Sequence, residues 1–115
     1  MINRVVLIGR LTRDPELLYS KQGLAYAKIR IAVNRNFKNG NGEQETDFID
    51  CTVWRKSAET ITQYCAKGSL IGITGRIQTS SYENKEGKRV YGTNVSAENV
   101  TFLERKKENA ENASL

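Results

Sequence analysis

Apolar and polar residues alternate along two long segments, which is the pattern of β-strands with one buried face. The segments span residues 26–38 and 70–82. Their apolar sides consist of Ala27, Ile29, Ile31 and Val33 in the first, and of Ile71, Ile73 and Ile77 in the second. Their polar sides carry Tyr26, Lys28, Arg30 and Asn34 in the first, and Leu70, Thr74, Arg76, Gln78, Ser80 and Tyr82 in the second. Other β-branched runs predict strands at residues 3–12, 89–95 and 100–103, with a bend or bulge at Gly9.

Residues 48–54 predict a further strand whose aromatic side chains fall on the polar side. One row is Ile49, Cys51 and Val53, and the other is Phe48, Asp50, Thr52 and Trp54. Burying the second row would bury a carboxylate and a hydroxyl with the rings, which is costly without hydrogen-bond partners. We therefore expect the first row in the core, and Phe48 and Trp54 on the surface. The alternative, in which Trp54 ends the strand and packs under a loop, stays open here.

One helix is predicted over residues 56–67, and it lies between the third and fourth strands. Its apolar face is Ala58, Ile61 and Cys65, its cap is Ser57, and its basic last turn and stop are Lys67 and Gly68. The turn-rich stretches 39–42 and 84–88 predict the tips of two long hairpins. Asp14-Pro15 and residues 21–23 mark further breaks.

This order of elements favours an all-β domain with one helix. A chain of 115 residues is long enough for one core, and closing a sheet into a small barrel hides its edges. We predict a five-stranded oligonucleotide-binding (OB-fold) barrel with extended hairpins over residues 1–103. A ferredoxin-like sandwich would need two crossover helices, and the sequence offers one. Residues 104–115 are charged and lack periodicity, so we expect a short mobile tail.

The charge of the chain favours a polyanionic partner. The net charge is +5, and residues 104–115 contribute three basic and three acidic side chains, so the folded part holds 15 basic and 10 acidic ones. Such an excess suits nucleic acid or an anionic membrane. No run of about 18 apolar residues is present, so no membrane span is expected. Arg4 and Arg10 come too early for a secretory signal, and we expect a cytoplasmic protein.

Residues suited to catalysis or metal binding are scarce. The sequence has no histidine, and its two cysteines, Cys51 and Cys65, cannot complete a four-ligand zinc site without carboxylates. We expect both thiols to be small buried hydrophobic groups rather than a disulfide or a nucleophile. A Gly-rich phosphate loop with Lys and Ser/Thr is also missing. We therefore predict no metal, no cofactor and no enzymatic activity.

Several stretches resemble a known family. They are residues 3–11 (NRVVLIGRL), residues 14–16 (DPE), residues 47–56 (DFIDCTVWRK), residues 64–69 (YCAKGS) and residues 75–79 (GRIQT). In this order, and without large gaps over residues 1–103, the chain resembles the bacterial single-stranded DNA-binding proteins. The resemblance implies a barrel that binds single-stranded DNA without reading its sequence.

Members of this family stack DNA bases on aromatic side chains at four places. The matching positions hold Phe37, Phe48, Trp54 and Tyr82. Alternation already puts Phe48 and Trp54 outside, and Tyr82 lies on the polar side of its strand. Unbroken alternation would put Phe37 on the side of Ile31 and Val33, so packing within its own hairpin stays an alternative.

Phosphates between stacked bases require cations along the same groove. The family commonly keeps a basic residue at the positions of Lys56 and Lys67. Proximity to the aromatic residues suggests Arg35, Lys38, Arg55, Arg76, Lys85 and Lys88 as well. For each of them, a solvated surface charge is an equally good alternative. Asp50 and Ser80 stand where the family often has a positive residue.

The resemblance also implies a homotetramer that acts in DNA replication, repair, recombination or DNA uptake, in the cytoplasm with the nucleoid. The chain ends KENAENASL rather than in a long linker with an acidic, Phe-ending tip. Recruitment of replication enzymes through such a tip is therefore not expected. Two other functions stay open: an interaction subunit of the tailless primosomal replication-restart type, and RNA binding through the same aromatic residues.

Overall fold

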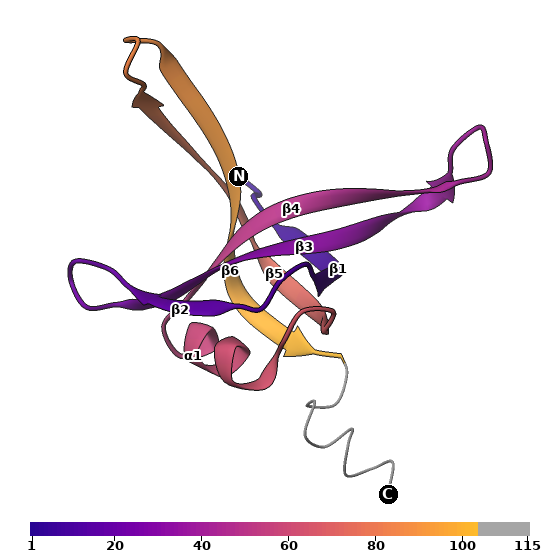
Figure 1. Cartoon of the computed structure of the whole chain (residues 1–115), viewed down its shortest axis with the longest axis horizontal. Helices are drawn as coiled ribbons and strands as arrows, with labels where there is room; N and C mark the ends of the chain where they lie inside the picture. Colours follow the sequence, from indigo (N-terminus) through magenta and orange to yellow (C-terminus); the bar gives the residue numbers. More distant parts are fainter. Residues whose placement is uncertain (104–115) are drawn as a thin grey trace, which may run out of the picture.

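A computed structural model describes residues 1–103 of the chain, and the expected tail at 104–115 lies outside the described residues. Six strands and one helix follow one another along the chain (Figure 1). They are β1 (Val5–Leu11), β2 (Glu16–Tyr19), β3 (Ala25–Lys38), β4 (Gln44–Trp54), α1 (Arg55–Tyr64), β5 (Leu70–Glu83) and β6 (Arg89–Phe102).

Five of the strands form a closed barrel. The strands are hydrogen-bonded in the order β1-β5-β6-β4-β3, and pairing of β1 with β3 at Arg10 and Leu11 closes the sheet. Strand β4 runs parallel to β6, and every other pair in the barrel is antiparallel. The five-stranded OB-fold is confirmed. Strand β2, which the sequence analysis did not predict, adds to the outer edge of β3 and is four residues long.

The barrel core comes from alternate residues of the strands and from one face of α1. Its largest fully buried side chains are Ile31, Val53, Cys51, Ile61, Ile71 and Ile73. The predicted inner rows of β3 and β4 are therefore confirmed up to Ile31 and from Cys51 onward. Burial raises the pKa of the Cys51 thiol to about 12, so this group stays protonated at neutral pH. Both cysteines are free.

Two residues differ from the predicted facing. Ile77 shares the alternation of Ile71 and Ile73 but is 47% exposed, because the outer part of β5 leaves the barrel as a hairpin arm. Thr52 belongs to the outer row of β4 and is nevertheless buried. The side-chain amide of Asn94 donates a hydrogen bond of 2.7 Å to its hydroxyl, which compensates this burial. The predicted strands 89–95 and 100–103 form the single strand β6.

Helix α1 begins and ends earlier than predicted. Its N-cap is Trp54 rather than Ser57, and no side-chain hydrogen bond caps it. It ends at Tyr64, so Lys67 does not belong to its last turn. The following segment is instead held by Asp14, whose carboxylate accepts a hydrogen bond of 2.7 Å from the backbone of Lys67. Within residues 1–103, no helix is long and apolar enough to cross a membrane.

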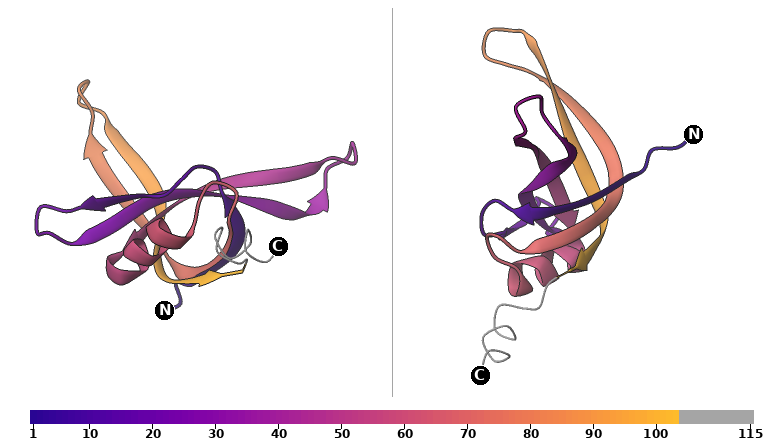
Figure 2. Two further views of the ribbon diagram at one scale, coloured as in Figure 1. Left: turned by 60° about the horizontal axis from the view of Figure 1, so that its bottom comes forward. Right: turned by 90° about the vertical axis from the view of Figure 1, so that its right-hand side faces the viewer.

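Three hairpins extend from the barrel (Figure 2). They join β2 to β3, β3 to β4, and β5 to β6, and we call the last two the β3–β4 arm and the β5–β6 arm. The tips of these two arms are closed by the same pattern of hydrogen bonds. The side-chain oxygen of Asn39 accepts backbone hydrogen bonds from Asn41 and Glu43, and that of Asn84 accepts them from Glu86 and Lys88. The two predicted hairpin tips are therefore confirmed.

Two glycines allow the strands of the barrel to approach closely. A Cβ atom on Gly9 would lie 2.6 Å from the carbonyl oxygen of Ala32, where β1 reaches β3. A Cβ atom on Gly75 would lie 2.1 Å from the carbonyl oxygen of Ser96, next to a shift in the β5–β6 register. Both obstacles are backbone atoms, so a side chain at either position would force the strands apart.

We predict that Gly75→Ala lowers the free energy of unfolding by about 3 kcal/mol, because the added methyl group overlaps the backbone of β6. Urea unfolding measures the change. Gly40→Ala is the matched control, since nothing lies within 4 Å of the added atom, and its effect should stay within about 0.5 kcal/mol. Equal stability of the two variants would contradict the close packing at Gly75.

Candidate nucleic-acid interface

Large aromatic side chains lie on the outer side of the sheet. Phe48 is 59% exposed, Trp54 40% and Tyr82 60%. The prediction that Phe48 and Trp54 lie on the surface is confirmed, whereas Cys51 and Val53 on the opposite side of β4 are buried. Strand alternation alone produces this separation, because successive side chains point to opposite sides.

The register of the sheet shows that these aromatic residues share one face. Paired residues of neighbouring strands point to the same side. Thr52 of β4 pairs with Ser96 of β6, and Ser96 pairs with Arg76 of β5. Arg76 and Tyr82 therefore lie on the same side as Phe48 and Trp54. We call this side the aromatic face, and it includes the β3 partners Tyr26, Lys28, Arg30 and Ala32.

Trp54 packs against a neighbouring ring and stays 40% exposed. Its ring centroid lies 5.5 Å from that of Tyr26, its cross-strand partner, at an interplanar angle of 36°. Aromatic pairs at this centroid distance stabilise each other beyond the area they bury. Tyr26 lies on the polar side of its predicted strand but was not among the predicted site residues. Alternation was the signal that could have found it.

A strained residue follows Trp54. Arg55 has a φ of 57°, which lies in the left-handed region that residues other than glycine rarely adopt. This conformation turns the chain from β4 directly into α1, so that Trp54 ends the strand and caps the helix. Lys56 follows in the first turn of α1 and is exposed. Arg55 and Lys56 therefore lie beside Trp54, as the sequence analysis expected.

The β3–β4 arm contains a register shift at the position of Phe37. Asn34 pairs with Thr46 and Lys38 pairs with Gln44, so residues 35–37 of β3 oppose Glu45 alone. Regular alternation does not apply inside such a bulge, which explains why the sequence pattern did not settle the facing of Phe37. The side chain of Phe37 lies outside the part of the chain that the structure describes.

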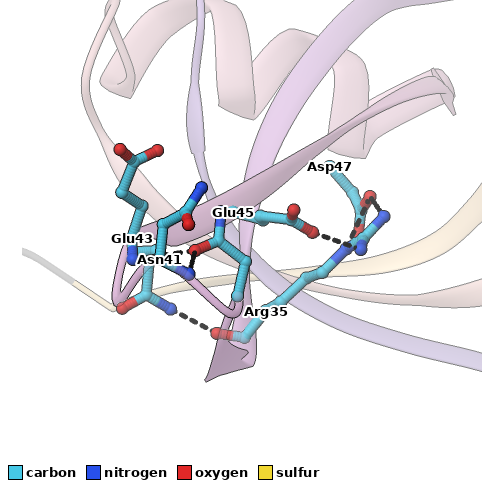
Figure 3. A network of polar contacts seen from close by, with 7 residues as sticks. Arg35, Asn41, Glu43, Glu45 and Asp47 are labelled. Carbon is cyan, nitrogen blue, oxygen red and sulfur yellow. Dashed lines mark hydrogen bonds and ion pairs between the residues drawn. The ribbon is translucent and has the colours of Figure 1, made fainter.

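Arg35 reaches two carboxylates of β4, those of Glu45 and Asp47 (Figure 3). Its guanidinium lies 3.0 Å from a carboxylate oxygen of Asp47 and also pairs with Glu45. Asp47 alternates with Phe48 along β4 and therefore lies on the side of Ile49 and Cys51. The hydrogen bond with Arg35 lowers the pKa of the Asp47 carboxyl group, and the same bond raises the pKa of Arg35.

The other predicted cations fall into three places. Arg76 lies on the aromatic face. Lys38 pairs with Gln44, which alternation along β4 puts on the same side as Phe48, so Lys38 belongs to that side as well. Lys85 and Lys88 lie at the tip of the β5–β6 arm, in the turn closed by Asn84. Lys67 lies on the loop between α1 and β5, next to Asp14. The structure thus gathers Arg76 with the three described aromatic residues and places Arg35 apart from them.

A polar cleft of about 320 Å³ opens on the aromatic face. Its lining comes from the segment after β1, from β3 and β4, and from the β5–β6 arm, and consists of Arg13, Lys28, Ile29, Asp50, Cys51, Thr52, Ser80, Gly92, Thr93 and Asn94. Asp50 forms an ion pair with Arg30, with an N···O distance of 3.2 Å. Arg13, Lys28 and Arg30 were not predicted as site residues, although Lys28 and Arg30 stand on the polar side of a recognised strand.

Within residues 1–103, no group of three or more acidic or cysteine side chains is placed to hold a metal ion. The aromatic face is a curved sheet surface with exposed rings and with cations between and beside them. Rings can stack on nucleobases and cations can pair with phosphates. The barrel topology and this face define the class of oligonucleotide-binding-fold proteins.

Residues 2–103 match the Single-strand binding protein family, and the chain belongs to that family. Single-stranded DNA-binding protein B of Bacillus subtilis is 56% identical over 106 residues, which cover 92% of this chain and 94% of that protein. The single-stranded DNA-binding protein of Halalkalibacterium halodurans is 62% identical over 104 residues, or 90% of this chain and 62% of that protein. Single-stranded DNA-binding protein 3 of Listeria innocua is 59% identical over 110 residues, or 96% and 69% of the two chains. The family resemblance noted in the sequence is confirmed.

We predict that Arg55→Gly raises the free energy of unfolding, by up to about 1 kcal/mol. The left-handed conformation costs an L-residue about 1–2 kcal/mol, and glycine avoids this cost. Glycine also loses more chain entropy on folding, which reduces the net gain in stability. Arg55→Ala keeps a Cβ atom and should leave stability close to that of the parent. In urea unfolding, Lys56→Gly should have the opposite sign, because this position is an ordinary helical one. A destabilised Arg55→Gly variant would refute strain at Arg55.

Proposed function

We propose that this protein binds single-stranded DNA without sequence preference and performs no catalysis. One observation carries the proposal: Phe48, Trp54 and Tyr82 are exposed on one face of one continuous sheet. Every base has a face that can stack, and each stacked base contributes about 1–3 kcal/mol. Duplex DNA hides those faces, so a surface of this kind selects unpaired strands.

The cations near these rings supply the electrostatic part of binding. Arg76 lies on the aromatic face, and Arg55 and Lys56 adjoin Trp54. Lys38, Lys67, Lys85 and Lys88 extend the positive charge toward the arms and the α1–β5 loop, where they can meet a strand that passes between the arms. The fourth stacking position is proposed at Phe37. Arg35 has the weakest support, because Asp47 and Glu45 already neutralise its charge on the other side of the arm.

In the cell, such a protein coats single strands that arise during DNA replication, repair, recombination or DNA uptake. We place it in the cytoplasm with the nucleoid, where those strands are. The family membership and the names of the relatives favour this function over that of an interaction subunit of the replication-restart type. RNA binding through the same rings is tested by comparing oligo(dT) with oligo(U).

We also propose that the protein assembles as a homotetramer through β1. In the part of the chain that the structure describes, β1 pairs with β5 along Val5–Arg10 but with β3 at Arg10 and Leu11 only, so most of one edge stays open. Its outward side chains Val6 and Ile8 are well exposed. An open edge beside exposed apolar side chains suits pairing with a second copy.

The proposed function predicts that oligo(dT) quenches the fluorescence of Trp54, the single tryptophan, and that duplex DNA does so far more weakly. Tyr82→Ala should weaken oligo(dT) binding by about 1–3 kcal/mol, because one stacked base is lost. Tyr91→Ala is the matched control: Tyr91 is exposed on the same arm but pairs with Ser81 on the opposite side. Failure of the parent protein to bind oligo(dT), or equal losses in both variants, would contradict the proposal.

The assembly proposal predicts that Ile8→Glu converts the tetramer into smaller species, because it places a charge at a desolvated contact. Light scattering at micromolar concentration measures the mass. Tyr19→Glu, which introduces the same charge at an exposed site on β2, should leave the tetramer intact. A parent protein that is monomeric at this concentration would disprove the assembly.

A further inference from the structure

The polar cleft on the aromatic face is lined by two cations, Arg13 and Lys28, that have no role in the proposed function above. Lys28 pairs with Thr52 across β3 and β4, and it lies two residues along β3 from Tyr26 on the same side. Arg13 reaches the cleft from the segment after β1. A strand rises about 3.3 Å per residue, so the Lys28 side chain leaves the backbone of β3 about 6.6 Å from that of Tyr26.

Arg13 lies on a segment that is fixed on both sides. The backbone and hydroxyl groups of Thr12 each donate a hydrogen bond to the carbonyl oxygen of Arg30, at 2.9 and 3.0 Å. On the other side, Asp14 accepts the hydrogen bond from the backbone of Lys67. Because both neighbours are anchored, the base of the Arg13 side chain needs little ordering when a ligand binds, which lowers the entropic cost of a contact.

The charges around the cleft leave a positive excess. Among residues 1–103, neither Arg13 nor Lys28 takes part in a salt bridge or side-chain hydrogen bond, although Glu16 lies across from Lys28 on β2. Asp50, the acidic residue of the described lining, is paired with Arg30. The hydroxyl group of Ser80 adds a potential hydrogen-bond donor on the arm side.

We propose that this cleft is a phosphate-binding site for single-stranded DNA, in which Arg13 and Lys28 contact the backbone next to a base stacked on the Tyr26–Trp54 pair. Asp50 limits the strength of this site by holding Arg30. The inference rests on the proposed function and adds a phosphate site to it. The side chains of Arg30 and Asp50 are 51% and 60% exposed, and a surface ion pair of this kind is weak. Loss of the Asp50 charge is therefore enough to free Arg30 for a phosphate.

The first test is the salt dependence of oligo(dT) binding, followed by Trp54 fluorescence. Each phosphate contact contributes a slope of about −0.7 to the plot of log affinity against log salt for single strands. Lys28→Gln and Arg13→Gln should each make the slope shallower by about 0.7, and should weaken oligo(dT) and oligo(dC) equally. Lys21→Gln, in the turn between β2 and β3, removes the same charge away from the cleft and should leave the slope unchanged.

The second test uses two aspartates of β4 that lie on opposite sides of the sheet. Asp50→Asn should tighten binding and make the slope steeper by about 0.7, because it frees Arg30 for a phosphate. Asp47→Asn is the matched control, since Asp47 pairs with Arg35 away from the aromatic face, and it should leave the slope unchanged. A purely structural role of the Arg30–Asp50 pair would not tighten binding.

The outcomes separate the two proposals. If the parent protein fails to bind oligo(dT), the proposed function itself is wrong. If the parent binds but Lys28→Gln and Arg13→Gln keep its salt slope, the phosphate site is wrong and the proposed function stands. Equal effects of Asp50→Asn and Asp47→Asn would show a general charge effect and also overturn the site. Lys28→Arg should keep the parental slope, and circular dichroism confirms that each variant is folded.

Discussion

The closure of the sheet on itself is the constraint on which the rest of this structure depends. Strand β1 pairs with β5 and then reaches β3, and backbone comes so close at this crossing that Gly9 has no room for a side chain. Gly75 permits a similar contact between β5 and β6. Closure buries the inner rows of all five strands around Ile61 of α1. The pairing of β4 with β6 makes the outer side continuous from β3 to β5, which separate hairpins would not do.

Because the outer side is continuous, residues that are far apart in the sequence lie on one surface. Phe48 and Tyr82 are 34 positions apart in the chain, yet the parallel pairing of β4 with β6 brings their strands into one register. The junction at Arg55 then keeps Trp54 on this surface while the chain turns into α1. Tyr26 supports the Trp54 ring from the neighbouring strand. Stacking needs a ring that is exposed but held in place, and Trp54 meets both conditions.

Charge on the two sides of β4 is arranged differently. On the inner side of the β3–β4 arm, Arg35 is neutralised by Asp47 and Glu45 beside the bulge that contains Phe37 (Figure 3). On the aromatic face, Asp50 occupies Arg30, whereas Lys28 and Arg13 take part in no ion pair within residues 1–103. The charged residues on the two sides therefore have unequal value for binding a polyanion. What matters is which side they lie on and whether a carboxylate already holds them.

The sequence by itself determined the strands, the exposed side of β4 and the family of the protein. Alternation in residues 48–54 fixes which side chains can be buried together, because a carboxylate between two rings is costly to bury. The limits of α1, the strand β2 and the exposure of Ile77 were decided by tertiary structure. Ile77 continues a buried row in the sequence, but the row leaves the barrel after Gly75, and no local pattern records where a barrel ends. Likewise, the pairing of Arg35 with Asp47, and of Arg30 with Asp50, depends on the register between β3 and β4, which only the folded chain defines.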